Sequence, residues 1–332
     1  MRMKLITCLF IVFVGCTGRL TAQDVHFSQF YLHPLHQNPA QTGSFRGDWR
    51  AAGIFRSQWR SVPVAYQTFG AAADLKLLRS DRNTVSVGIQ LQHDQAGDAV
   101  LRWAQLGLSA AVTHALTDRQ TLSAGFGFSA VQRSVDISGL RFKNQWDGDL
   151  FNPNLSSKEN FNQNSGFAPS LAGGINWRLE LDDEGRNALY AGLGAFHLNR
   201  PEVNFRDDAD YRLPVRAALS LGASLPAGEK FDVLAFALGQ QMRTAREIVA
   251  GLGARYWLDE AYVQFSGGYR AGDALIPAIQ IGLGGWTVGL SYDVNISNFD
   301  IATQNRGGFE LGVVYQAQPV PPVKNLKVCP LF

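Results

Sequence analysis

The sequence predicts an all-β fold, a transmembrane antiparallel β-barrel of about 14 strands whose two ends both lie on the periplasmic side of an outer membrane. Three observations predict this fold. Segments of about ten residues alternate large apolar with small or polar side chains between residues 49 and 316. Charged residues make up only 17% of the chain, below the roughly 25% of typical soluble domains. After residue 22, no run of about 18 apolar residues could cross a membrane as a helix.

Residues 1–22 have the layout of a secretory signal peptide. Two basic residues precede the apolar run 5–14, and small and polar residues lead to Ala22. We therefore expect an exported mature chain that begins at Gln23. In the alternative reading, the leader is a lipoprotein signal and Cys16 is lipidated and retained.

The mature chain is nearly neutral. The full chain has 30 Lys and Arg and 28 Asp and Glu. Removal of the leader, with Arg2, Lys4 and Arg19, leaves 27 basic and 28 acidic residues. This balance gives no electrostatic reason to expect a nucleic-acid partner. Outside the leader the chain contains a single cysteine, Cys329, which cannot close an internal disulfide.

Residues 23–48 precede the first expected strand and contain large apolar side chains beside two prolines. Among these side chains are Phe27, Phe30, Tyr31, Leu32 and Leu35. Such side chains are usually buried. The segment is therefore expected either to plug the barrel or to dock on a periplasmic partner.

The strands follow from the period of the pattern. In residues 84–93, Val85, Val87, Ile89 and Leu91 fall on one face, and small or polar residues fall on the other. A period of two residues is that of a β-strand. The expected strands are 49–60, 66–77, 84–93, 101–113, 121–133, 169–179, 188–198, 215–225, 231–240, 247–257, 261–270, 277–284, 286–294 and 308–316.

A soluble β-sandwich would alternate in the same way, but it would present abundant charge on its outer face. Here the second face carries mainly Gly, Ser, Thr, Gln and Ala, which suits a lumen. Aromatic residues near strand ends suit girdles at the two membrane interfaces; they include Trp49, Trp59, Trp103, Trp177, Tyr256, Trp257, Trp286 and Tyr315.

The connections between strands give independent support. Every second connection is a tight turn, and the others are generally longer, up to the stretch 134–168. This asymmetry is expected of a barrel with short periplasmic turns and longer extracellular loops. The barrel is thus expected to span residues 49–316, followed by a stiff, proline-containing periplasmic tail at residues 317–332.

No motif predicts an enzyme, a cofactor or a metal. His26, His33 and His36 lie close together in the sequence, but prolines interrupt the stretch and only Asp24 accompanies them. The glycine doublets 192/194, 251/253 and 282/284 have strand spacing and no following helix, which favours small lumen-facing residues over a nucleotide loop. Asp147 and Asp149 do not complete a calcium loop.

Charged residues on the expected lumen face have two interpretations. They could pair with one another inside a narrow or plugged barrel, or they could line a conduction path. They are Asp74, Lys76, Arg102, Arg178, Glu180, Arg216, Arg255, Arg270, Asp293 and Glu310.

The beginning of the mature chain, DVHFSQFYLHPLHQNPAQTG at residues 24–43, together with FRSQW at 55–59, resembles the signature of the PorP/SprF family of outer-membrane proteins. Further similar stretches are FHLNRP at 196–201, GLSYDVN at 289–295, GGFE at 307–310 and CPLF at 329–332. The resemblance covers essentially the whole mature chain. The sequence departs from the family pattern at His33, where Asn is usual, and at Leu331, where Arg is usual.

The resemblance implies an outer-membrane component of the type IX protein secretion system of Bacteroidota. Such a protein is needed for the secretion or surface retention of cargo such as gliding adhesins. The implied partners are other secretion components, cargo or adhesin C-terminal domains and outer-membrane lipid, with no catalytic or cofactor residues. Family-motif residues that could contact partners are Phe27, Ser28, Gln29, Asn38, Pro39, Ala40, Gly43, Arg56, Gln58, Trp59, His197, Asn199, Pro201, Cys329 and Pro330.

Two other functions remain open at this point. One is a passive or solute-selective outer-membrane porin, and the other is an exported soluble or lipidated β-protein. The sequence does not identify the cargo, and it does not show whether the lumen is open.

Overall fold

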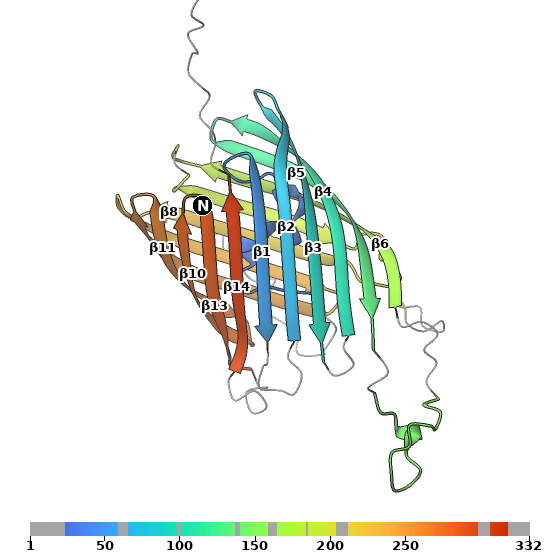
Figure 1. Cartoon of the computed structure of the whole chain (residues 1–332). Coiled ribbons are helices and arrows are strands. Elements are labelled where there is room, and N and C mark those ends of the chain that lie inside the picture. Colours follow the sequence, from blue (N-terminus) through green and yellow to red (C-terminus); the bar gives the residue numbers. More distant parts are fainter. Residues whose placement is uncertain are drawn as a thin grey trace, which may run out of the picture.

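The computed structural model describes residues 24–58, 66–97, 101–136, 140–158, 165–183, 185–203, 212–297 and 306–317. Fourteen strands form one closed antiparallel barrel, in which each strand pairs with its neighbours in the chain and β1 pairs with β14 (Figure 1). The predicted all-β barrel of about 14 strands is therefore confirmed. Within the described residues, no helix is long and apolar enough to cross a membrane.

The strands are β1 Trp49–Gln58, β2 Tyr66–Arg79, β3 Asn83–Ala96, β4 Leu101–Thr117, β5 Gln120–Ser134, β6 Ser165–Glu180, β7 Ala188–Phe196, β8 Arg216–Pro226, β9 Phe231–Met242, β10 Ala245–Leu258, β11 Ala261–Arg270, β12 Ala274–Leu283, β13 Trp286–Asn295 and β14 Arg306–Gln316. Every expected segment overlaps one of these strands. Several strands, β4 and β6 among them, continue past the alternating pattern because backbone pairing with the next strand carries on into the rim.

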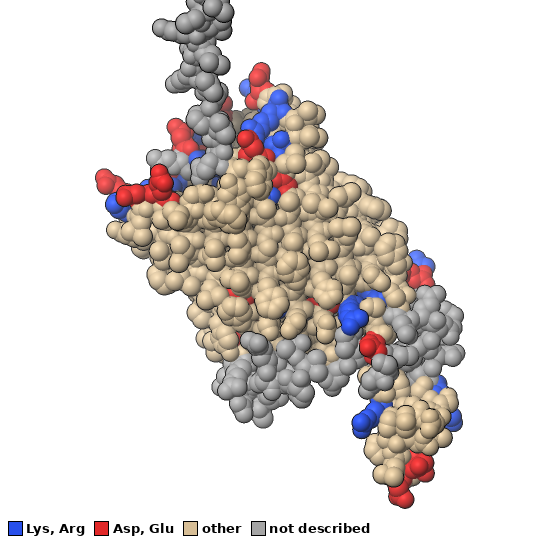
Figure 2. Space-filling model, in the orientation of Figure 1, with Lys and Arg blue, Asp and Glu red and all other residues tan. Residues whose placement is uncertain are grey.

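The wall has an apolar outer face and a polar inner face. On β3 and β4, Ile89 and Leu108 are 46% and 59% exposed, whereas Ser86 and Gln105 are 1% and 6% exposed. Figure 2 shows the result on one side of the molecule, where the wall between the two rims carries few charged residues. In water so wide an exposed apolar surface would be unfavourable, but in a bilayer it is the surface that contacts lipid.

The two rims differ, as the connection lengths predicted. The tight turns and the outer ends of β1 and β14 lie at one rim, here called the short-turn rim, and the long connections lie at the other (Figure 1). Two connections at the long-loop rim are shorter than expected, since only Arg243 and Thr244 join β9 to β10, with Arg243 at a φ of 57°, and only residues 271–273 join β11 to β12.

Three of the predicted girdle aromatics form a cluster at the short-turn rim. The rings of Trp49 and Trp286 lie 4.9 and 4.7 Å from the ring of Tyr315. Two others were assigned to the wrong face. Trp257 donates its indole N–H to the buried Asp232, and Trp103 packs edge-on against the buried His197, so both lie on the lumen side.

Residues 24–45 lie inside the barrel and are here called the plug. Three short 3₁₀ turns shape it, η1 Phe30–Leu32, η2 Pro34–His36 and η3 Pro39–Gln41. Proline opens η2 and η3, where its fixed φ suits the first turn. Phe27 is 0% exposed and Leu35 is 2% exposed. The aromatic residues of this segment are thus buried in the lumen, as in the plug interpretation of the sequence.

Candidate functional site: the plugged lumen

A buried group of charges from four strands holds the start of the plug. Arg56 of β1 pairs with Asp293 of β13 at 2.7 Å and with Glu310 of β14 at 3.4 Å. Arg270 of β11 pairs with the same Asp293 at 2.9 Å. These four residues are here called the ionic clamp, and the side chain of each is at most 4% exposed. Buried charges are tolerated when they are paired and hydrogen-bonded.

The plug supplies the remaining hydrogen bonds of the clamp. The backbone N–H groups of Ser28 and Gln29 donate to the two carboxylate oxygens of Glu310, at 2.8 and 2.6 Å. The hydroxyl of Ser28 donates to Asp293 at 2.6 Å and accepts hydrogen bonds from Arg56 and Arg270. Because Glu310 binds Ser28 and Gln29 and Asp293 also binds Ser28, this end of the plug has a fixed position.

A second anchor lies on β8 and in the loop that follows β7. Asp24 pairs with Arg216 at 2.9 Å and lies 3.4 Å from the ring nitrogen Nε2 of His197. Burial by itself would raise the pKa of Asp24, but the Arg216 guanidinium and His197 hold it well below its usual range. Arg216 also donates to the backbone carbonyl of His36 at 2.8 Å, which connects the anchor to the middle of the plug.

The rest of the plug rests on glycines of the wall. A Cβ atom on Gly125 of β5 would lie only 2.4 to 2.5 Å from backbone atoms of Pro39 and Ala40. On Gly194 of β7 it would lie 2.3 Å from the carbonyl oxygen of Gln37. Asn38 donates to the carbonyl of Ile175 at 2.7 Å and accepts the N–H of Ala40. These glycines therefore let the plug backbone approach the wall directly.

The exit of the plug towards β1 is fixed in a similar way. Gly43 has a φ of 75°, a conformation that favours glycine. Its N–H donates to Asp74 at 2.8 Å, and Asp74 pairs with Arg50 at 2.8 Å.

The plug also buries a histidine in an apolar setting. His33 is 0% exposed and stacks on Phe27 with ring centroids 5.7 Å apart. Burial lowers the pKa of His33 to about 4, so the ring is neutral at pH 7. In the described part of the chain no group of three or more His, Cys, Asp or Glu could hold a metal ion.

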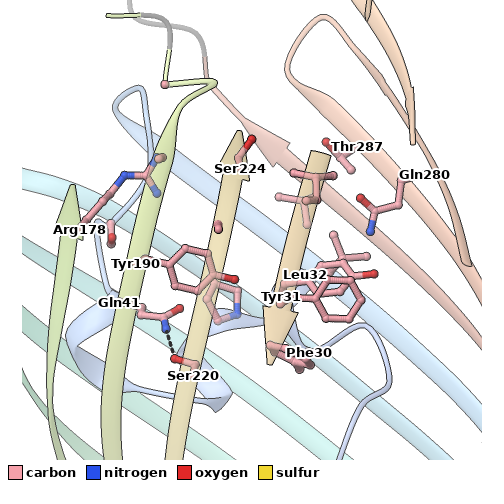
Figure 3. A pocket seen from close by; sticks show the side chains of 18 of the residues that line it. Phe30, Tyr31, Leu32, Gln41, Arg178, Tyr190, Ser220, Ser224, Gln280 and Thr287 are labelled. Carbon is pink, nitrogen blue, oxygen red and sulfur yellow. Dashed lines mark hydrogen bonds between the residues drawn. The ribbon is translucent and has the colours of Figure 1, made fainter. Parts of the chain in front are cut away.

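The plug separates two cavities. The outer vestibule, towards the long loops, has a volume of about 710 Å³ and is lined by Asp24, Val25 and His26 of the plug. The inner vestibule, towards the short-turn rim, has a volume of about 340 Å³. Figure 3 shows the inner vestibule, with Phe30, Tyr31 and Leu32 of the plug facing Tyr190 and Ser220 of the wall.

Most of the predicted site residues meet at the plug. Phe27, Ser28, Gln29, Asn38, Pro39, Ala40, Gly43, Arg56 and His197 are buried between plug and wall. Gln58 lines the outer vestibule. Asn199 and Pro201 lie in the loop after β7, where Asn199 donates to the carbonyl of Pro169 and the carbonyl of Pro201 accepts the N–H of Leu213. Trp59, Cys329 and Pro330 lie outside the described residues, as do the leader and residues 318–332.

The predicted lumen charges are largely paired, as in the first interpretation of the sequence. Arg102 was assigned to the wrong face, because it is exposed and falls on the same side of β4 as Leu106 and Leu108. Gly284 was also misplaced, since it lies in the turn after β12 with a φ of 54°. Of the other doublet glycines, Gly251 and Gly282 lie under the rings of Phe236 and Tyr262.

Sequence reasoning missed two parts of the site. The Asp24–Arg216 pair was not foreseen, although Asp24 is the only acid beside the three plug histidines. The wall glycines that contact the plug backbone, Gly125 and Gly194, were also missed; they are here called the glycine cradle. A usable signal existed, since glycine recurs on the lumen face of strands that otherwise favour larger residues.

Comparisons with known proteins agree with this architecture. The family model described as type IX secretion system membrane protein PorP/SprF matches residues 20–315. A search of curated proteins finds no match.

Among solved structures, the toluene transporter TbuX of Ralstonia pickettii is similar, with a TM-score of 0.52 and 11% identity over 87% of this chain and 94% of that chain. The deltaS2 and deltaS2S3 mutants of the monoaromatic hydrocarbon channel TodX have TM-scores of 0.50 and 0.51, each at 11% identity. The matches cover 86% and 85% of this chain and 93% of each TodX mutant chain. At such identity the likeness shows the fold alone.

Proposed function

Because the chain belongs to the PorP/SprF family of type IX secretion system membrane proteins, we propose that it serves that system in the outer membrane, in the secretion or surface retention of cargo such as gliding adhesins. The match over residues 20–315 is the observation that carries the proposal. It includes the plug and all fourteen strands, so the whole described architecture belongs to the family.

The geometry of the lumen supports a role in protein assembly over passive conduction. A porin keeps a polar lumen filled with water, whereas here the plug is buried between the ionic clamp and the glycine cradle. Of the charges that could line a conduction path, Glu310, Asp293 and Arg216 bind the plug instead. We propose that the protein acts by binding other components of the system and cargo C-terminal domains, and that it is not an enzyme.

We also propose an orientation, with the short-turn rim towards the periplasm and the long loops outside, as is usual for bacterial barrels. An epitope inserted after Asn154, which is exposed in the connection between β5 and β6, should label intact cells. An epitope inserted after Asp183, in the β6–β7 turn, should label only permeabilised cells. The reverse result would overturn the orientation.

The function is tested in a strain that lacks the gene. Surface labelling of a cargo with a type IX C-terminal domain should fall in that strain and return when the wild-type gene is restored. Normal cargo display in the absence of the gene and of its paralogues would refute the proposal. Steady single-channel conductance of the purified wild-type barrel in planar bilayers would favour the porin alternative.

A further inference from the structure

The inner vestibule carries features that holding the plug does not require. Its floor is the plug, with Tyr31, Gln37 and Gln41, and its wall includes Tyr190 of β7, Arg255 of β10 and Tyr262 of β11. It opens towards the short-turn rim, where β10 and β11 meet. A cavity of about 340 Å³ is within the range of sites that bind small ligands, roughly 300 to 1,000 Å³.

Among the described residues, the guanidinium of Arg255 has no carboxylate partner. It donates to the amide oxygen of Gln264, at 2.9 and 3.2 Å, and lies over the ring of Tyr262 at 4.5 Å. Asp232 is opposite Arg255 in the β9–β10 ladder. However, Asp232 accepts Arg186 at one oxygen and the indole N–H of Trp257 at the other, both at 2.6 Å.

The surroundings of the vestibule leave a positive charge. Among the described residues, the guanidiniums of Arg46, Arg50, Arg178 and Arg255 pair with only two carboxylates, those of Asp74 and Glu180. Arg46 and Arg178 share Glu180, at 2.8 and 2.6 Å. An arginine fork that lacks an acid partner in a concave, aromatic-walled site is suited to bind a carboxylate.

The floor offers unpaired amide groups. Gln37 is 2% exposed, and in the part of the chain that the structure describes neither its Nε2 nor its Oε1 has a hydrogen-bond partner. The side-chain oxygens of Asn176 and Ser224, which also line the vestibule, are likewise without partners. Buried polar groups are nearly always paired. A ligand that brings both an N–H and a C=O would pair with the Gln37 amide, as a peptide backbone does.

We propose that the inner vestibule binds a short acidic segment of an extended peptide, with a carboxylate on Arg255 and a backbone amide on Gln37. Tyr190 and Tyr262 supply flat apolar contacts for its side chains. This inference rests on the proposed function, which places a protein partner on the periplasmic side of the barrel. A hydrocarbon ligand would leave Gln37 unpaired, and a metal cation would meet the uncompensated charge of Arg255.

Binding is measured with the purified full-length barrel in detergent. The probe is a fluorescent pentapeptide with two aspartates and an amidated end, and its diasparagine counterpart is the matched probe. Anisotropy should show that the aspartate peptide binds about 10- to 100-fold more tightly, the range of a charge-assisted hydrogen bond. Arg255→Gln should abolish that preference, and Gln37→Leu should weaken both peptides.

Arg246→Gln is the matched control, because Arg246 is an exposed arginine of the same strand that lines the outer vestibule instead. It should leave binding unchanged. Equal binding of the two peptides, or wild-type binding by a heat-modifiable Arg255→Gln barrel, would overturn the proposal. Absence of any binding by the wild-type barrel would overturn it as well.

The two proposals can fail separately. Loss of cargo display in the deletion strain, together with normal display by Arg255→Gln and equal binding of the two peptides by the wild-type barrel, would refute the vestibule site and leave the secretion function standing. Normal display in a strain that lacks the gene and its paralogues would refute the secretion function, whichever peptide binds more tightly.

Discussion

The glycine cradle makes a sharp prediction, because one methyl group at Gly125 should loosen the plug. A Cβ atom there would lie 2.4 Å from the backbone nitrogen of Ala40, about 1 Å closer than ordinary van der Waals contact. The obstacle is backbone, so no side-chain rotation relieves it. The plug must retreat by a comparable distance, which would stretch the 2.7 Å hydrogen bond from Asn38 to Ile175 beyond bonding range.

The magnitude follows from these two losses. Overpacking of this kind costs about 1 to 3 kcal/mol, and a lost hydrogen bond costs about 1 kcal/mol. Gly125→Ala should therefore weaken plug docking by about 2 to 4 kcal/mol, a factor of roughly 30 to 1,000 in the docking equilibrium. The wall itself keeps its backbone pairing, since β5 gains only a methyl group on its lumen face.

Planar-bilayer conductance measures the effect. The wild-type barrel should stay mostly closed, and Gly125→Ala should show frequent openings while the barrel remains heat-modifiable. Gly268→Ala is the matched control, because the nearest atoms to its Cβ would all belong to Ile276 and lie at ordinary contact distances of 3.4 to 3.8 Å. A Gly125→Ala barrel that is folded and as closed as the wild type would refute the reasoning, and so would equal opening of the control.

Three further predictions follow from the wall, the clamp and the plug histidine. Ile89→Arg, on the lipid face near the bilayer midplane, should lower the stability of the barrel by about 2 to 4 kcal/mol, whereas Gln90→Arg should lower it little. Equal losses of heat-modifiable barrel in the two variants would contradict the assignment of Ile89 to the lipid face and of Gln90 to the lumen face. Arg56→Ala, which leaves the buried carboxylate of Glu310 without a cationic partner, should destabilise plug docking by about 3 to 5 kcal/mol and expose residues 24–45 to protease, whereas Arg46→Ala at an exposed pair should change little. Acid should also open the barrel. Docking of the plug holds the pKa of His33 near 4 instead of 6.5, so protonation of His33 favours the undocked plug. The stability of plug docking is therefore complete above pH 6.5 and falls by about 2 kcal/mol by pH 5. His33→Asn should reduce this pH dependence of conductance, and the remainder should come from His26 and His36, whose pKa values burial also lowers; an unchanged dependence would contradict the assignment.

The strands of the barrel wall could be predicted from the sequence because residues close together in the chain determine each strand. Alternation with period two is set by neighbouring residues, and each of the fourteen segments carries it independently. The errors fall at the rims, where the local pattern ends and pairing with the next strand decides. Trp103 and Trp257 illustrate this, because aromatic residues near a strand end are equally common at a membrane interface and on a wet lumen face.

The plug contacts could not be predicted in the same way, because they join distant parts of the chain. Ser28 and Glu310 are 282 residues apart, and His36 and Arg216 are 180 residues apart. The resemblance identified Ser28, Gln29 and Arg56 as residues that belong together, but it suggested contact with partners. The structure shows that these residues bind one another and the wall.

The buried charges of the ionic clamp bear on the choice between a secretion component and a porin. On an empty lumen face, Arg56, Arg270, Asp293 and Glu310 would form a polar constriction suited to conduction. Here Asp293 and Glu310 are already occupied by the hydroxyl of Ser28 and the backbone N–H groups of Ser28 and Gln29. A passing solute would have to displace these bonds and would leave charges of less than 5% exposure without their partners. The wall of this barrel is therefore built to hold a segment of its own chain, and the surfaces free to act are the two vestibules and the rims.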